Sequence, residues 1–357
     1  MSSTTSQAGA VSQARARAAV RLTDIDRAKG IAILLVVFGH LVARQTPAHV
    51  TWYDPLRIVV YLFHMPLFMY LSGYVTFLSG AARTPRHDWP KLVRKRATRL
   101  LIPFLLFGLA ILCAKLVASH FAAVDNVPPD LFDGLRALVW DTQHSPATSV
   151  WYIAVLFVFC IATPPLLALD PSRTALVCVA IALYLLPLPP PFYLDRIGTY
   201  FIFFVAGGLA ADAGPRWQRI VDLTRWPTLG GLAAVTFLVA SGHITFQWTE
   251  GAQGFPYKWA LLIAGLLSLP AVHGLVRHAP FAASGTLILL GRYVFVIYLL
   301  NTPFIGAAKA VLLKFVSWDG SHFLPFAAAL MLAGILGPIA VKRWLLRRFP
   351  TLDRMTD

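Results

Sequence analysis

Two side chains that could do chemistry lie on one face of an apolar segment near the start of the chain. In "DRAKGIAILLVVFGH", residues 26–40, Lys29 and His40 are eleven positions apart. On a helix this spacing is about 20° more than three full turns, so both side chains point along one face, roughly 16 Å apart. A cation at one end and an imidazole at the other fit a long ligand with an anionic head and a reactive tail. Acyl-coenzyme A (acyl-CoA) has this shape.

His40 is the residue we expect to act as general base in an acyl transfer. A neutral imidazole takes the proton of an acceptor hydroxyl as its oxygen attacks a thioester, and desolvation favours the neutral form. No carboxylate stands near enough in sequence to orient the ring, so that partner should come from another helix. The alternatives are that His40 only packs between helices and that Lys29 only anchors the helix at the membrane interface, paired with Asp26.

His64 is a second histidine inside an apolar segment, in the tripeptide "HMP". Pro66 cannot donate to the carbonyl of Leu62, which frees or kinks the helix near this depth. We expect His64 to lie level with His40, where it orients that ring or binds the acceptor. The alternative, given equal weight, is that His64 only forms a hydrogen bond with the backbone group that Pro66 leaves without a partner.

The segments that position these groups are long and apolar. The chain is 57% hydrophobic and only 13% charged, with a mean hydropathy of +0.66. Blocks of about 20 apolar residues predict an all-α polytopic membrane protein with about ten transmembrane helices and both termini cytoplasmic. The expected spans are 29–46, 56–79, 100–122, 150–169, 174–190, 194–211, 228–246, 257–275, 292–315 and 323–341. Residues 276–291 are expected to form a surface or re-entrant segment. The alternative that they form an additional transmembrane span stays open.

The net charge of +15 is interpreted as a signal of topology. Most Lys and Arg residues flank the spans on the side that this topology places in the cytoplasm, which argues against nucleic-acid binding. Residues 1–20 are expected to be a disordered cytoplasmic tail, 21–345 an integral membrane domain and 346–357 a cytoplasmic C-terminal tail. The cysteines show neither a disulfide framework nor metal spacing. They are Cys113, Cys160 and Cys178.

Several stretches resemble acyltransferase family 3, the membrane-integral acyltransferases. "IDRAKGIAILLVVFGH" (25–40) carries a basic residue, ten further residues and a histidine, here Lys29 and His40, in a "D-x-x-K-G-I" variant that includes Asp26. The other matching stretches are "FHMPLFMYLSGY" (63–74), "RKRATRLLIPF" (94–104), "VWYIAVLF" (150–157) and "LGRYVFVIYLLNTPF" (290–304). The resemblance covers residues 24 to about 345.

This resemblance implies an O-acyltransferase of a bacterial inner membrane. Such a protein moves an acyl group, by default acetyl, from cytoplasmic acyl-CoA to a hydroxyl of a polysaccharide, glycan or glycolipid at the outer face, without a metal. The acyl group, the acceptor, an acyl-enzyme intermediate and the oligomeric state stay open. A transporter or flippase for an anionic lipid or metabolite is the alternative, which the lack of intramembrane carboxylates and internal repeats disfavours.

Arg96 and Arg99 belong to the basic run of the matching stretch 94–104. Together with Lys29 and Asp26 they are assigned to binding of coenzyme A. The arginines suit its phosphates, because a guanidinium binds phosphate through two parallel hydrogen bonds. Three residues apart, the two arginines would share a helical face. Anchoring to lipid headgroups is the alternative.

The remaining candidates lie near the outer side or on the ninth span. Those assigned to the acceptor are Trp151, Tyr152, Asp195 and Arg196. The alternatives are an aromatic belt for the first two and a simple ion pair for the other two. Tyr298 and Asn301 share a face and are expected to donate hydrogen bonds to the thioester oxyanion or to a sugar. Many family members have histidine where this chain has Asn301, which can only form hydrogen bonds.

Overall fold

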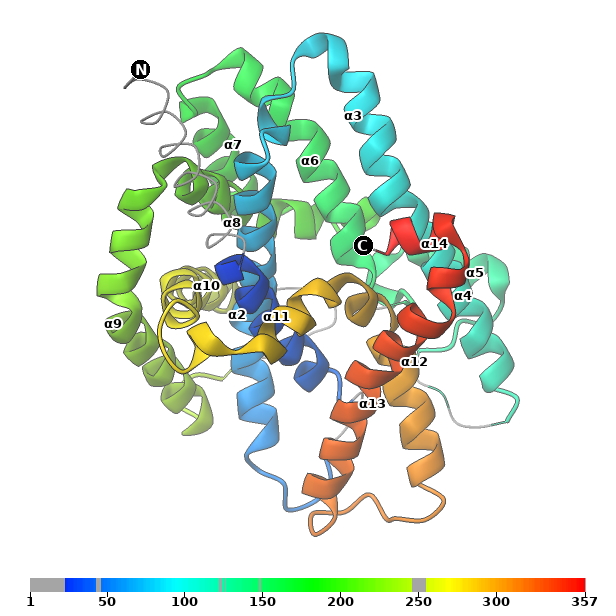
Figure 1. Cartoon of the computed structure of the whole chain (residues 1–357). Helices are drawn as coiled ribbons and strands as arrows, with labels where there is room; N and C mark the ends of the chain where they lie inside the picture. Colours follow the sequence, from blue (N-terminus) through cyan, green and yellow to red (C-terminus); the bar gives the residue numbers. More distant parts are fainter. Residues whose placement is uncertain are drawn as a thin grey trace, which may run out of the picture.

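The computed structural model describes residues 23–42, 46–121, 124, 126–147, 149–245 and 255–356. Regular structure in these ranges is entirely helical. After a first helix at residues 23–39 come α2 (Tyr53–Leu78), α3 (Trp89–Arg96), α4 (Ile102–Ala118), α5 (Leu131–Val139), α6 (Trp151–Leu169), α7 (Thr174–Leu185), α8 (Leu194–Ala213), α9 (Pro215–Ala240), α10 (Phe255–Leu275), α11 (Gly285–Arg292), α12 (Val294–Leu312), α13 (Phe323–Trp344) and α14 (Pro350–Met355) (Figure 1). The tail predicted at residues 1–20 lies outside the described ranges.

The predicted fold class, an all-α polytopic membrane protein, is confirmed. Eight of the described helices are long and apolar enough to cross a membrane, and α7 is a shorter apolar helix. The segment 276–291 contains α11, whose eight residues are too short to cross. The first helix corrects the expected span 29–46, because it ends at residue 39. The number of crossings and the sidedness stay predictions.

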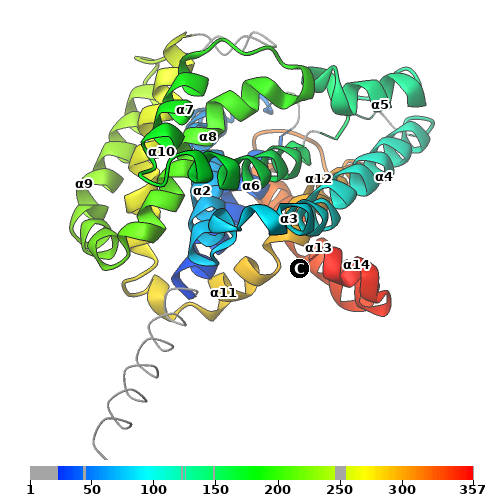
Figure 2. The same ribbon diagram turned by 90° about the horizontal axis from the view of Figure 1, so that it is seen from above.

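The helix α2 forms the centre of the molecule and is the most buried of the eight candidate spans. In the view from above, α9 and α10 lie on one side of α2, while α4, α12 and α13 lie on the other (Figure 2). The closest packing is with α8, where glycines let the two backbones approach. A Cβ atom at Gly207 would overlap the carbonyl oxygen of Tyr70, and one at Gly73 would overlap that of Phe204.

Replacing Gly207 with leucine is therefore expected to lower the free energy of unfolding by more than about 3 kcal/mol, since α2 and α8 would have to separate. Thermal unfolding of the purified protein in detergent measures this change. The matched control is Gly230→Leu on α9, where no atom lies within 4 Å of an added Cβ. Equal melting temperatures for the two variants would contradict the close contact.

The C-terminal end of the first helix is held by side chains of α2. Three donors spaced four residues apart reach two of its last backbone carbonyls, which lack partners within the helix, and one carbonyl three residues beyond it. They run from Tyr53 to Phe38 (2.6 Å), from Arg57 to Val42 (2.9 Å) and from Tyr61 to Gly39 (2.7 Å). Gly39 also makes room for the Tyr61 ring, which an added Cβ would meet. The helix therefore stops just before His40.

The N-terminal end of the first helix is held by ion pairs. Arg277, which follows α10, bonds Asp24 at 2.8 Å and Asp222 of α9 at 2.9 Å. The hydrogen bonds to Asp222 hold the pKa of the Arg277 guanidinium above its ordinary value. This cluster joins three helices one turn before Lys29.

The short helix α11 crosses the first helix at the same end. Added Cβ atoms at Gly30 and Gly291 would overlap the backbone carbonyls of Leu287 and Asp26 respectively. The glycine of the "D-x-x-K-G" motif is thus needed for close backbone packing. Together, the ion pairs and this contact fix the position of Lys29.

Candidate active site

His40 lies directly after the first helix, and its backbone N–H is shared between the carbonyls of Val36 and Val37 (3.2 and 3.1 Å). The residue is half-buried. Within the described ranges its ring forms no hydrogen bond, so the expected orienting partner from another helix is not found there. His64 lies within electrostatic range of the ring. The two histidines therefore lie close enough to interact electrostatically.

His64 is buried in α2, and its Nδ1 atom lies 2.7 Å from the carbonyl oxygen of Val60. Because a carbonyl only accepts, Nδ1 carries the proton and Nε2 is left as an acceptor. This bond does not go to the Leu62 carbonyl that Pro66 leaves without a donor, and α2 continues through Pro66. The ring also packs against Tyr61 at 5.2 Å between centroids.

A line of side chains follows His64 along α2 at four-residue intervals, on one helical face. It consists of Phe68, Ser72 and Thr76, which face α6 and α12. The Ser72 hydroxyl lies 2.5 Å from the Tyr152 hydroxyl. This stripe was missed from the sequence, although its regular spacing from His64 is the signal that could have shown it.

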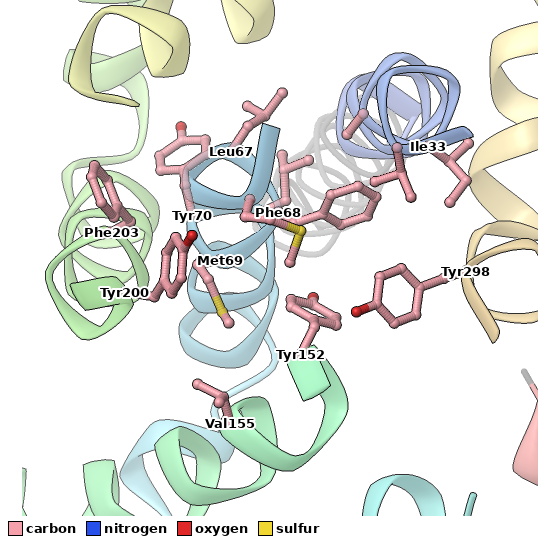
Figure 3. Packing of buried hydrophobic residues seen from close by; sticks show 14 of the residues in the cluster. Ile33, Leu67, Phe68, Met69, Tyr70, Tyr152, Val155, Tyr200, Phe203 and Tyr298 are labelled. Carbon is pink, nitrogen blue, oxygen red and sulfur yellow. The ribbon is translucent and has the colours of Figure 1, made fainter. Parts of the chain in front are cut away.

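The stripe meets further polar and aromatic groups on α6 and α12. Tyr152 lies 5.2 Å from Tyr298 and 5.7 Å from Phe68 between ring centroids. Figure 3 shows the Tyr298 hydroxyl directed toward Tyr152. Further along α2, the Thr76 hydroxyl lies 3.9 Å from the Cys160 thiol.

Asn301 lies one turn from Tyr298 and is fully buried. Its Nδ2 atom donates to the carbonyls of Ile297 (2.9 Å) and Tyr298 (2.8 Å), which occupies both amide hydrogens. The side chain therefore presents its Oδ1 atom, an acceptor, rather than the donor that an oxyanion requires.

The basic run at the start of the third span does not form one regular helix. Between α3 and α4 lies a π-helical turn, Ala97–Leu101, which changes the direction in which following side chains point. Arg96 is half-buried and lies within electrostatic range of Cys160. Arg99 is exposed and lies within electrostatic range of Lys29. Arg99 and Arg96 thus interact electrostatically with different groups, Lys29 and Cys160 respectively.

Lys29 completes the charged end of this face. Its Nζ atom lies 4.0 Å from the Asp26 carboxylate, the pairing expected from their spacing. Both side chains keep about a quarter of their surface exposed, at 25% and 29%. Lys29, Asp26 and Arg99 therefore form a partly accessible charged group at the opposite end of the helix from His40.

The residues assigned to an acceptor lie around the start of α6 and α8. The Arg196 guanidinium stands 4.5 Å from the Trp151 ring centroid, and Trp151 packs against Tyr200 at 5.2 Å. Trp151 and Tyr152 are both buried, so neither lies at the molecule's surface as a belt residue would. One carboxylate oxygen of Asp195 is buried without a hydrogen bond in the described ranges.

Comparison with known proteins finds a matching family and two related proteins. The model of the acyltransferase domain, Acyl_transf_3, matches residues 22–343. Nodulation protein NolL of Sinorhizobium fredii (strain NBRC 101917 / NGR234) is 42% identical over 119 residues, 32% of this chain and 30% of that protein. Nodulation protein NolL of Mesorhizobium japonicum (strain LMG 29417 / CECT 9101 / MAFF 303099) is 43% identical over 86 residues, 23% and 21%.

The matched stretches thus span less than a third of either curated relative. No solved structure matches the chain. In the part of the chain that is described, no three His, Cys, Asp or Glu residues are grouped to hold a metal ion. Since the family model covers most of its length, the chain belongs to the Acyl_transf_3 acyltransferase family, and the resemblance drawn from its motifs is confirmed.

Proposed function

We propose that this membrane acyltransferase moves an acyl group, by default acetyl, from cytoplasmic acyl-CoA to a hydroxyl of a glycan or glycolipid at the outer face of a bacterial inner membrane. The observation that carries the proposal is the placement of Lys29 and His40 at opposite ends of one helix. Arg99 interacts electrostatically with Lys29 at one end, and His64 interacts with His40 at the other. A phosphate group and a thioester are the two ends of an acyl-CoA arm, and they need these two kinds of partner.

The phosphates would bind at the Lys29 end. Lys29 supplies a point charge and Arg99 a fork of donors, and both are partly accessible. Asp26 keeps Lys29 in place and leaves its other ammonium hydrogens to the ligand. Arg96, directed toward α6, would contact the part of the ligand that has entered the protein.

The reaction would take place at the His40 end. His40 removes the proton from the acceptor hydroxyl while its oxygen attacks the thioester carbonyl. The C–S bond then breaks, and the imidazolium returns the proton to the departing thiolate of coenzyme A. His64, whose tautomer is fixed by Val60, presents Nε2 as the acceptor that can orient His40 or the substrate hydroxyl.

The acceptor would bind between α6 and α8. There the Trp151 ring and the Arg196 guanidinium are stacked, and the Asp195 carboxylate has an oxygen free to accept a hydroxyl. Tyr152 supports this wall through its bond to Ser72. Aromatic rings beside hydrogen-bonding side chains suit the two surfaces of a sugar.

Replacing Arg99 with alanine is expected to weaken binding of coenzyme A about 10- to 100-fold, because a charged hydrogen bond contributes roughly 1.5–3 kcal/mol. KM for acetyl-CoA should rise and kcat at saturation should stay within a factor of about two, as expected for a group that binds ground and transition states equally. Arg96→Ala should behave likewise.

Titration calorimetry with coenzyme A measures this effect, and Arg219→Ala on the exposed surface of α9 is the matched control. Unchanged affinity in both variants would assign the two arginines to lipid headgroups instead.

The proposed activity is tested with the purified protein in lipid nanodiscs. Acetyl-CoA should be cleaved, with release of coenzyme A thiol, faster than without protein, and a glycan acceptor should increase the rate. A transporter would bind or move the ligand without breaking the thioester. Absence of cleavage with a panel of acyl-CoA donors and acceptors would refute the proposal.

A further inference from the structure

The α12 residues Tyr298 and Asn301 are buried without complete hydrogen bonding. Their side chains are 3% and 0% exposed. Both the Tyr298 hydroxyl and the Asn301 Oδ1 atom lack a hydrogen bond of ordinary geometry in the described ranges. A buried polar atom without a partner destabilises the folded state, and two on one helical face call for an explanation.

The two atoms have complementary chemistry. The Tyr298 hydroxyl can donate. The Asn301 Oδ1 atom is an acceptor, and the Nδ2 atom beside it already donates to two carbonyls of its own helix. A donor and an acceptor one helical turn apart match a group that carries both a carbonyl oxygen and an N–H. A secondary amide is such a group. An oxyanion, which needs donors alone, matches only half of the pair.

The pair lies between the two ends of the proposed acyl-CoA site. Tyr298 packs against Phe68, at 6.3 Å between centroids, and against Tyr152. Phe68 is one turn along α2 from His64, about 6 Å by helix rise, and Ser72 is one turn further. A hydrogen bond of 3.3 Å between Thr302 and Ser149 holds this part of α12 against the start of α6.

The start of α6 adds further donors at the same place. No side chain caps this helix, so its first backbone N–H groups are without partners from within it. Tyr152 is its second residue, and the Tyr152 backbone N–H approaches the Tyr298 hydroxyl oxygen, which leaves the hydroxyl hydrogen to donate. An amide carbonyl placed here could accept from the Tyr298 hydroxyl.

We propose that Tyr298 and Asn301 bind an amide of the pantetheine arm of acyl-CoA, an inference that rests on the proposed function. The arm carries its amides between the phosphate and the thioester, and the pair lies between Lys29 and His64. An acetamido sugar offers the same chemistry. We favour the arm because Phe68, which Tyr298 contacts, lies one turn further than His64 from the α2 residues that hold the end of the first helix near His40. The role replaces the oxyanion contact expected from the sequence.

The test compares Tyr298→Phe and Asn301→Leu with the wild type for binding of coenzyme A and of adenosine 3′,5′-bisphosphate, which lacks the arm. We expect each variant to lose about 10-fold in coenzyme A affinity and to keep its affinity for the bisphosphate. KM for acetyl-CoA should rise while kcat stays near the wild-type value. Tyr184→Phe, on α7 and bonded to the Lys258 carbonyl, is the matched control and should change neither.

Each other outcome overturns the inference in a recognisable way. A fall in kcat with KM unchanged would indicate that Tyr298 stabilises the thioester oxyanion, as expected from the sequence. A change in KM for an acetamido-sugar acceptor alone would assign the amide site to the acceptor. Unchanged coenzyme A affinity in both folded variants would refute the amide site without contradicting the proposed acyltransferase function. Failure of the wild type to bind either ligand would instead refute the proposed function.

Discussion

Replacing His40 with alanine is expected to reduce acyl transfer about 10²- to 10⁴-fold, because the acceptor hydroxyl would lose its general base. Coenzyme A affinity should change little, since the phosphates bind three turns away. The rate is measured at saturating acetyl-CoA with the purified variant.

The His40 substitution should leave the fold intact. The ring forms no hydrogen bond within the described ranges, and the helix end is held by Tyr53, Arg57 and Tyr61 rather than by His40. His64→Gln is the informative companion, because an amide can still bond the Val60 carbonyl but cannot accept a proton. Full activity in a folded His40→Ala protein together with loss in His64→Gln would move the base to His64.

An acetyl donor whose arm is one methylene longer should be transferred about 10²-fold more slowly. If Lys29 and Arg99 fix the phosphates, the thioester carbonyl is displaced by roughly 1 Å relative to His40, and an error of that size can cost this much. Affinity should stay close to that of acetyl-CoA, because both donors carry the same phosphates and amides.

The control for the longer donor is its rate of hydrolysis in water without protein, which should equal that of acetyl-CoA. Equal enzymatic rates for the two donors would contradict a fixed distance between the two ends. The thioester would then reach His40 by a flexible route.

The sequence alone predicted the helical class and the family, because these depend on apolar length and on the motif residues. The shared face of Lys29 and His40 stays a prediction. The sequence-based prediction placed the end of the first helix too late. That end is set by donors from α2, which are far away in sequence and satisfy the carbonyls of Phe38 and Gly39. Local propensity in "LLVVFGH" shows no such stop.

Other differences also arise from tertiary contacts. The π-helical turn at Ala97–Leu101, which contains Arg99, has no signal in spacing alone. The aromatic start of α6 suggests a membrane belt, but packing against α8 and α12 buries it. The acceptor character of Asn301 depends on two carbonyls of its own helix, which the residue type does not reveal.

The most direct test of the account is a structure of the protein bound to a thioether analogue of acetyl-CoA, which cannot be cleaved. The account predicts that the phosphates contact Lys29 and Arg99 and that the arm passes Tyr298. It also predicts that the carbonyl of the analogue lies next to the place where His40 would bind the acceptor hydroxyl. Phosphates bound at Arg196, or a carbonyl placed away from both histidines, would contradict it.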